Sequence, residues 1–307
     1  MEKEFEESFE GLYNKIYDSC KDRLKEVKDK NNKFLLVVGI VLAVINLIIY
    51  IMPNLRYLFG LSMSISACVL MILLMSGNKN YKRIYKENVI EGLIKAYNEK
   101  FYYSPTNGIT KVEYGLSNFD NKVDEYYSED RVYGTLDNGD NFQLAEVVTF
   151  EVSRTVDADG KVKENKTQTF RGMYGVVRLE KNTLSNIYIA SNSKFRKFSK
   201  NRLEVDSSLF EEYYDCITKD KVDTMRIFTS ELIEKYIEIV KDNKYGFELK
   251  IVDNMMFFRY KTNQLFEPPM FSSGLDKNFI KKNYKVLYYP LEIMKSTIDA
   301  VHEVFGE

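Results

Sequence analysis

The sequence predicts an α+β protein with an N-terminal two-helix transmembrane hairpin, flanking amphipathic helices, and then a domain of antiparallel β-meander plus helices. Three observations predict this. Two apolar runs of bilayer length lie between residues 34 and 75. Apolar residues recur every three or four positions on both sides of these runs. After residue 101 the pattern changes to short segments rich in β-branched and aromatic residues, with turn residues between them.

The composition excludes several classes of protein. Of 307 residues, 45% are hydrophobic and 14% aromatic, so the chain can bury a core and is not disordered. Cys20, Cys68 and Cys216 are far apart and form no CxxC pair, which predicts neither a disulfide framework nor a zinc cluster. The single histidine, His302, lies beside the apolar stripe of the last predicted helix, and we expect it to be packed or half-exposed there.

Residues 34–75 are predicted to form the transmembrane hairpin, with spans at 34–52 and 57–75. The first run reads FLLVVGIVLAVINLIIYIM and contains one polar residue, Asn46. The second run reads YLFGLSMSISACVLMILLM and is uncharged throughout. Each run is long enough to cross a bilayer as a helix. A cleaved signal peptide is not expected, because 33 mostly polar residues precede the first run and a second run follows it.

Lys and Arg residues near the span ends predict the orientation. Cytoplasmic flanks of a span carry the excess of these residues. The turn between the runs contains only Arg56. The flanking basic residues are Lys21, Arg23, Lys25, Lys28, Lys30 and Lys33 before the first run, and Lys79, Lys82, Arg83 and Lys86 after the second. We therefore expect a cell-membrane protein with two spans and both termini in the cytoplasm.

Polar and small residues within the spans predict helix packing rather than transport. In an antiparallel hairpin Asn46 lies within reach of Ser62, Ser64 and Ser66, which can form hydrogen bonds with it. Gly60 and Ser64, with Ala67 or Cys68, form a small-residue face that allows close approach within the hairpin or between copies. Neither span contains an ionisable residue of the kind that marks a transport pathway.

Amphipathic helices are predicted on both sides of the hairpin, at residues 1–33 and 76–101. The apolar stripes are Phe5, Phe9, Leu12, Ile16, Cys20, Leu24 and Val27 in the first segment, and Tyr81, Tyr85, Val89, Leu93 and Tyr97 in the second. Either the two stripes pair as an antiparallel stalk, or each packs on the domain.

Residues 102–307 are predicted to form the cytoplasmic α+β domain. Strands are expected at 131–136, 142–156, 161–179 and 185–191 as a meander, with turns at 137–140 and 157–160. The long second hairpin is expected to project beyond the sheet. Another hairpin is expected at 246–261, about Asp253 and Asn254. Helices are expected at 208–217, around 221–228, at 230–240, and in a last helix that begins at Pro290.

Several short motifs in this order resemble the bacterial domain of unknown function 3137 family. They are Glu129-Asp130, Gly134, Phe142 and Glu146, then Phe170-Arg171-Gly172, Ser208-Leu209-Phe210 and Phe266-Glu267-Pro268. The resemblance covers roughly residues 80–305 and agrees with the layout of two apolar segments before a cytoplasmic α+β domain. It implies no established activity and no catalytic residue. It also implies an association with LemA-like membrane proteins in bacterial gene neighbourhoods.

The acidic motif residues are a candidate site. Glu129 and Asp130 precede a strand, and Glu146 lies in the partner strand, so three carboxylates can cluster. Paired carboxylates suit acid–base chemistry, and hard cations prefer oxygen ligands. The alternative is that these acids are solvated or cap backbone groups. The acids of the two turns, Asp137, Asp140, Asp157 and Asp159, do not have EF-hand spacing. We expect neither a cofactor nor a metal.

A basic segment is the second candidate site. It consists of Lys194, Phe195, Arg196, Lys197, Phe198, Lys200 and Arg202. Nucleic acid is not expected as a partner, because residues 102–307 contain 29 Lys plus Arg and 33 Asp plus Glu. Anionic lipid of the inner leaflet is the favoured partner of this segment. A solvated loop is the alternative.

The sequence favours a membrane-anchored interaction or scaffold module that faces the cytoplasm. The lipid bilayer and another membrane protein are the expected partners, and no oligomeric state is specified. The alternative is a carboxylate- or metal-dependent enzyme that uses Glu129, Asp130 and Glu146.

Overall fold

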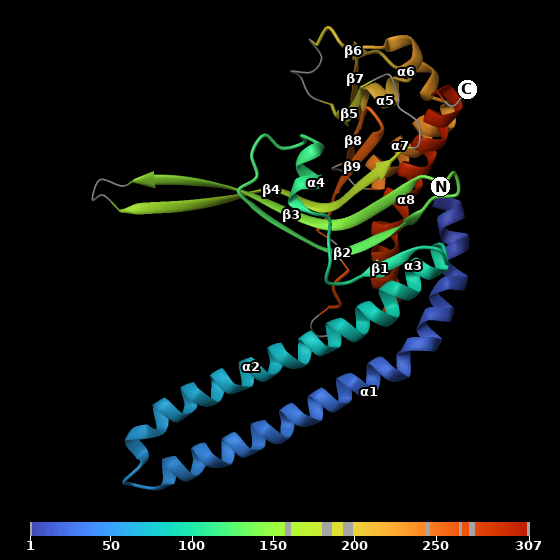
Figure 1. Cartoon of the computed structure of the whole chain (residues 1–307). Helices are drawn as coiled ribbons and strands as arrows, with labels where there is room; N and C mark the ends of the chain where they lie inside the picture. Colours follow the sequence, from blue (N-terminus) through green and yellow to red (C-terminus); the bar gives the residue numbers. More distant parts are fainter. Residues whose placement is uncertain are drawn as a thin grey trace. The chain divides into compact units, whose positions relative to one another are not determined.

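The computed structural model describes residues 2–156, 161–179, 186–192, 199–242, 246–263, 266–269 and 274–305 (Figure 1). Two long N-terminal helices are followed by an antiparallel sheet with helices, which confirms the α+β class. The chain divides into two compact units. The sheet unit contains Met1–Gly11, Leu93–Phe266 and Lys281–Glu307, and the hairpin unit contains Leu12–Gly92 and Glu267–Ile280.

The hairpin unit is built on two long antiparallel helices. Helix α1 (Glu2–Ile51) is continuous and leads into a 3₁₀ turn at Arg56–Leu58. Helix α2 (Phe59–Tyr85) returns and continues through a π-helical turn, Lys86–Ile90, into α3 (Glu91–Tyr97). Two helices of the described chain, Phe5–Ile51 and Arg56–Tyr97, are candidate membrane spans by length and composition.

Contacts within the hairpin unit show the antiparallel stalk. A methyl group at Gly92 would lie 3.6 Å from the Cγ1 atom of Ile16. Arg23 donates a hydrogen bond to Asn88 at 2.9 Å, and Asn31 donates to the carbonyl of Gly77 at 3.1 Å. The apolar stripes predicted for the two segments are buried here, as the burial of Cys20, Leu24, Tyr85 and Val89 illustrates.

The first turns of α1 belong to the sheet unit. They follow the other alternative, in which an amphipathic helix packs on the domain. Phe5 and Phe9 are fully buried. The Phe5 ring stacks on Tyr284 at 5.3 Å between centroids and meets the edge of Tyr288 at the same distance. One amphipathic helix therefore pairs with α2 along part of its length and packs on the domain at its N-terminal end.

The sheet of the described chain has nine strands in the order β1-β2-β3-β4-β9-β8-β5-β7-β6, and all its pairs are antiparallel. The strands are β1 (Tyr102–Ser104), β2 (Glu125–Thr135), β3 (Asn141–Val156), β4 (Val162–Arg178), β5 (Ile187–Ser191), β6 (Arg202–Leu203), β7 (Tyr214–Thr218), β8 (Phe247–Val252) and β9 (Met255–Lys261).

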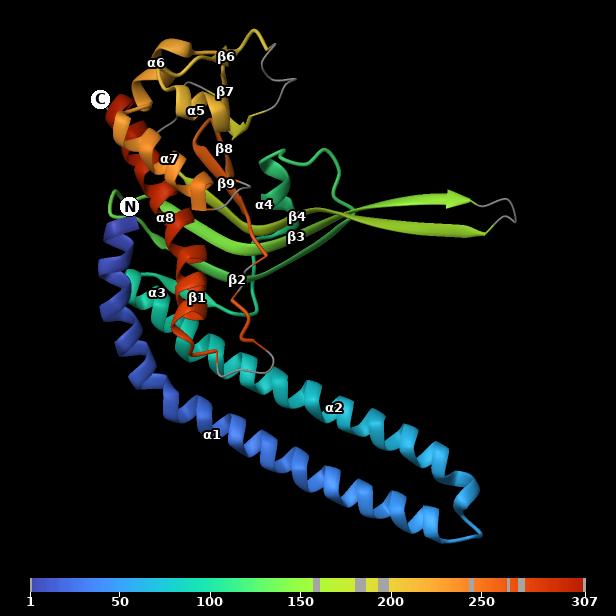
Figure 2. The same ribbon diagram turned by 180° about the vertical axis from the view of Figure 1, so that it is seen from behind.

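The β3–β4 hairpin extends beyond its neighbours, as predicted. Pairing between β2 and β3 ends at Glu125 and Phe150, whereas pairing between β3 and β4 continues to Val156 and Val162. The two-stranded part projects as an arm in both views (Figures 1 and 2). Its residues Val156 and Val162 are more than 60% exposed.

The predicted meander is wrong at one point, because β4 pairs with β9 and not with β5. The β8–β9 hairpin, which turns at Asp253 and Asn254 as predicted, lies between β4 and β5 in the sheet. Alternation in the sequence identifies a strand and its buried face, but it does not specify which strand lies beside it.

Helices α4 (Lys111–Leu116), α5 (Ser208–Tyr213), α6 (Lys221–Ile227), α7 (Ser230–Asp242) and α8 (Lys277–Phe305) complete the described elements. The helix predicted at 208–217 ends at Tyr213, and the next five residues form β7, which pairs with β5. The last helix begins 13 residues before Pro290, because the Asp276 side chain accepts a hydrogen bond from the Phe279 amide and begins the helix there.

Both faces of the sheet carry buried side chains. Under α4 lies a cluster of Ile109, Tyr114, Ala145, Val147, Phe170, Tyr174, Val176 and Phe257. On the opposite face α8 approaches β4 at Gly175, where an added methyl group would lie 2.6 Å from the sulfur of Met294. Gly175 therefore allows a close approach of helix and strand.

Candidate functional sites

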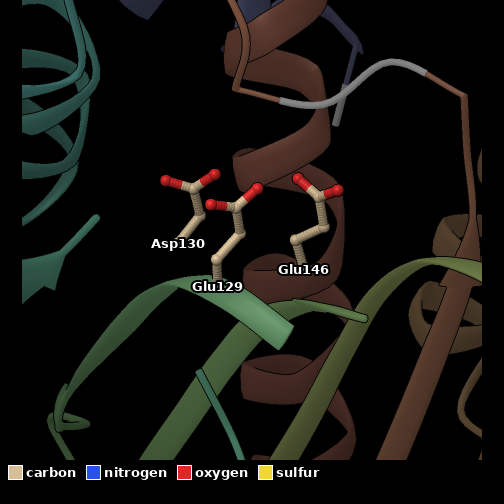
Figure 3. A group of neighbouring side chains, drawn as sticks. All are labelled: Glu129, Asp130 and Glu146. Carbon is tan, nitrogen blue, oxygen red and sulfur yellow. The ribbon is translucent and has the colours of Figure 1, made fainter. Parts of the chain in front are cut away.

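Three carboxylates converge on one face of the β2–β3 pair (Figure 3). Glu129 of β2 lies directly opposite Glu146 of β3. The register then shifts, so that Asp130 and Arg131 occupy the place of one residue before pairing resumes at Val132. This is a β-bulge, and Asp130 adopts the left-handed conformation with φ of 57°. The bulge brings the Asp130 carboxylate to the side of the two glutamates.

The burial of this carboxylate cluster is uneven. Asp130 is fully buried, Glu146 is 6% exposed, and Glu129 is exposed. Tyr103 of β1 donates a hydrogen bond from its hydroxyl to Asp130. The hydroxyl of Ser128 donates to the Glu146 carbonyl at 2.8 Å. These hydrogen bonds fix the carboxylate of Asp130 and the backbone of Glu146.

The spacing of the carboxylates fits a hard cation. One oxygen of each group lies within 4.8 Å of the others. Oxygen ligands bind Ca²⁺ or Mg²⁺ at roughly 2.0–2.6 Å, so two ligands of one ion are at most about 5 Å apart. The structure brings together the three acids that the sequence grouped.

The turn acids and the histidine form a separate contact. The Nε2 atom of His302 lies 2.8 Å from the Oδ2 atom of the fully buried Asp140. His302 is half-buried, which agrees with the expectation. Asp137 binds Lys295 at 3.0 Å. Asp157 and Asp159 lie outside the described residues.

Asn46 forms one of the three hydrogen bonds considered for the spans. Its Nδ2 atom donates to the Ser66 hydroxyl at 2.8 Å and to the Leu42 carbonyl at 2.7 Å, and both Asn46 and Ser66 are buried. The hydroxyls of Ser64 and Ser66 also donate to the carbonyls of Gly60 and Ser62, one turn earlier. Within the predicted spans, the Asn46–Ser66 hydrogen bond links α1 to α2.

The small-residue face of the second span is directed away from α1. Gly60, Ser64, Ala67 and Cys68 are all exposed. Among the described residues, none comes within 4 Å of a methyl group placed at Gly60. The small-residue face therefore does not mediate the approach of α1 and α2 within the hairpin.

The basic segment lies mostly outside the described residues, which exclude 193–198 and therefore Lys194, Phe195, Arg196, Lys197 and Phe198. Lys200 is exposed. Arg202 of β6 is bound within the sheet unit, with its Nε atom 3.1 Å from Asp215 and its Nη2 atom in contact with Glu211. The carboxylate of Glu204 lies 3.9 Å from the Nη1 atom of Arg202. Lipid contact by the basic segment stays a prediction.

A pocket of about 340 Å³ was not predicted from the sequence. It lies where α4 ends, over strands β8, β5 and β7. Lys250, Tyr188 and Ile217 stand side by side there, because Tyr188 pairs with Lys250 on one side and with Ile217 on the other. These residues come from three segments, so no local spacing in the sequence indicates the site.

Comparison with known proteins identifies one family. Residues 168–297 match the family model of DUF3137, which is described as a protein of unknown function. The chain carries a DUF3137 domain. No curated protein matches the chain, and no solved structure does.

The DUF3137 domain contains only part of the motifs that carried the resemblance. Phe170-Arg171-Gly172, Ser208-Leu209-Phe210 and Phe266-Glu267-Pro268 lie within the matched residues. Glu129, Asp130 and Glu146 lie before them, so the carboxylate cluster is outside the DUF3137 match. Strands β5 to β9 and the pocket residues Tyr188, Ile217 and Lys250 lie inside it.

Proposed function

We propose that the protein is anchored in the cell membrane by residues 34–75 and presents its sheet unit to the cytoplasm as an interaction or scaffold module. The observation that carries this proposal is the exposure of the apolar residues in α1 and α2. Only 6% of the most apolar stretch of each helix is buried. A core helix of a soluble protein buries such residues, whereas a helix that is apolar on all sides and left uncovered requires lipid around it.

The residues at the hairpin tip support the same proposal. Tyr57 is 79% exposed. The guanidinium of Arg56 lies 4.7 Å from the centre of the Tyr50 ring, and that ring lies 5.3 Å from Phe59. Aromatic and basic side chains with an apolar body and a polar end are typical of the membrane–water interface. Together with the basic flanks, they favour a hairpin whose tip lies at the outer surface.

Site-directed labelling in intact cells tests the topology. A membrane-impermeant maleimide should label a cysteine introduced at Asn54 in the tip, and should not label one introduced at exposed Lys200 until the cells are opened. Each cysteine is introduced into a chain whose Cys20, Cys68 and Cys216 are replaced by Ser or Ala. Labelling of position 200 from outside would contradict the cytoplasmic placement of the sheet unit.

Lipid contact by the basic segment is the finer part of this proposal. Each cation near an anionic leaflet contributes about 1 kcal/mol. Hydrogen exchange of the full-length protein in nanodiscs should show slower exchange at 191–201 with anionic lipid than with neutral lipid. The difference should disappear when Lys194, Arg196, Lys197 and Lys200 become Ser while Arg202 is retained. Equal exchange in both lipids would contradict the contact.

We propose divalent-cation binding as a second candidate function, because the convergence of Glu129, Asp130 and Glu146 favours it. Such a site would supply a Lewis acid to a carboxylate- or metal-dependent enzyme. Tb³⁺ replaces Ca²⁺ at oxygen sites, and a tyrosine beside the ion sensitises its emission. Tyr103, which contacts Asp130, is placed for this.

Terbium titration of the full-length protein in detergent tests the second candidate. Glu146→Gln should weaken the sensitised binding about tenfold or more, and Ca²⁺ should compete with Tb³⁺ in the unaltered protein. Glu164→Gln, on the exposed arm, is the matched control and should change nothing. Equal affinity in both variants would rule out the carboxylate cluster as the ion site.

A further inference from the structure

The pocket at the end of α4 is lined by hydrogen-bond donors and positive charge. Lys219 and Lys250 contribute ammonium groups, and the amide donors come from Asn118, Asn186 and Asn201. None of the described lining residues is acidic. Such a lining disfavours a cation and suits an anion.

Lys250 is the most constrained of these groups. Its ammonium donates to the carbonyls of Ser117 and Asn118, at 3.0 and 2.6 Å. It lies 4.9 Å from the centre of the Phe119 ring and 4.8 Å from that of Tyr188. An ammonium has three donors, so one donor is left after the two carbonyls. The side chain is half-buried and held in position from both sides.

The neighbouring carboxylates are bound to another cation. Asp120 and Glu248 each accept a hydrogen bond from Arg259 at 2.8 Å. Within the described part of the chain, Lys250 has no carboxylate at ion-pair distance. Burial, followed by the positive charge of Arg259, lowers the pKa of Lys250. A bound anion would stabilise the charged form of Lys250 and would raise its pKa again.

The rest of the pocket is mainly apolar, with Ser117 and Thr218 as its further polar residues. Leu116, Ile217 and Val252 line it together with the ring of Tyr188. The volume of about 340 Å³ is at the small end of the range for ligand pockets, roughly 300–1,000 Å³. The space therefore suits a compact molecule with one charged end rather than a polymer or a lipid chain.

We propose that this pocket binds a small organic anion with one carboxylate or phosphate group and a short apolar body. Lys250 and Lys219 contact the anionic group, and the aliphatic side chains contact the body. Lys219 and Lys250 lie within the DUF3137 match, whereas residues 116–118 of the lining lie before it. No described lining residue belongs to 34–75 or to the carboxylate cluster.

Titration of the full-length protein in nanodiscs with phenyl phosphate and phenylacetate tests the proposal and distinguishes the two anionic groups. Saturation-transfer NMR reports binding. At least one probe should bind tenfold or more tightly than both inorganic phosphate, which lacks the body, and benzyl alcohol, which lacks the charge. Equal binding of benzyl alcohol, or no binding of either anion at millimolar concentration, would overturn the proposal.

Two variants and one control locate the binding. Lys250→Gln should weaken binding about tenfold or more, because a charge-assisted hydrogen bond is lost. Leu116→Trp should also weaken it, by filling the pocket while the Lys250 contacts remain. Lys241→Gln, an exposed cation at the end of α7, should leave binding unchanged. Binding of unaltered strength in both Lys250→Gln and Leu116→Trp would place the ligand elsewhere and overturn the site.

Discussion

Residues 34–75 and strand β9 contain the same kinds of side chain in opposite surroundings. In the first region Ile40, Val44 and Leu47 are 57%, 50% and 56% exposed. In β9, Met256 and Phe258 are fully buried. The sheet unit removes apolar surface from water by packing, whereas the helices of the hairpin leave theirs uncovered. The difference is what the proposed membrane anchoring predicts, because apolar side chains that face lipid need no cover of packed protein.

Polar side chains differ between the same two regions. The spans contain no charged side chain and join their helices through the Asn46–Ser66 hydrogen bond. The sheet unit buries charged groups and pairs them, as Arg202 does with Asp215. In water a buried charge can find a partner during folding, whereas in a bilayer a charge in the span has a high cost before any partner is found.

The largest effect should come from charges placed in the exposed apolar surface of the spans. Val44 and Ile65 lie near the middle of the two runs and are at least half exposed. In lipid, Lys at both positions should cost about 5 kcal/mol or more and remove the protein from the carbonate-resistant membrane fraction. Val112→Lys, at a 77% exposed position of α4, is the control and should have no effect. Unchanged fractionation of the double variant would show that lipid does not cover the hairpin.

The next effect should come from the buried ion pairs of β6 and β7. Arg202→Ala leaves the fully buried Asp215 without its guanidinium and should lower the free energy of unfolding by about 3 kcal/mol. Lys200→Ala, two residues earlier and exposed, should change it by less than about 0.5 kcal/mol. Urea unfolding of the full-length protein in mild detergent measures both. Similar values for the two variants would mean that Arg202 has no structural role.

A smaller effect should come from the capping box of α4. The Thr110 hydroxyl accepts a hydrogen bond from the Glu113 amide, and the Thr110 amide donates to the Glu113 carboxylate. Thr110→Ala should cost about 1 kcal/mol of stability. Thr167→Ala, at an exposed position of β4, should cost less. Urea unfolding at neutral pH compares the two.

The same capping box predicts a pH dependence. Burial alone would raise the pKa of Glu113, but the hydrogen bonds from Thr110 and Gln143 and the charge of Arg131 together lower the pKa from its ordinary 4.5. Its stabilising contribution is therefore present above pH 4.5 and is lost as the pH falls through the folded-state pKa. The stability difference between the unaltered protein and Glu113→Gln should shrink over that range. A difference that does not change with pH would contradict the role of the carboxylate.

The smallest effect should come from the polar pair of the hairpin. Asn46→Leu removes the hydrogen bond to Ser66 and should destabilise the hairpin by about 0.6 kcal/mol, the typical value between helices in a membrane. Ser64→Ala is the control, because the Ser64 hydroxyl donates to Gly60 in its own helix. Unfolding in a denaturing detergent measures both. A loss of several kcal/mol in Asn46→Leu would contradict an ordinary hydrogen bond between helices in a membrane.

Local patterns in the sequence determined much of this protein. The apolar runs predicted the two long helices, and Asp253-Asn254 and the turn at 137–140 predicted two hairpins that the structure contains. Alternating residues predicted the length of β3 and β4 and the projecting arm. Period, turn chemistry and length are properties of neighbouring residues, so they can be recognised without the fold.

The tertiary structure decided what depends on distant residues. The pairing of β4 with β9, the conversion of 214–218 into a strand, and the row of Lys250, Tyr188 and Ile217 each require partners far along the chain. The sequence could group Glu129, Asp130 and Glu146, but the bulge that turns Asp130 toward the others depends on pairing with β3. Such features arise from the competition of many long-range contacts for the same buried surface, and no short pattern specifies its outcome.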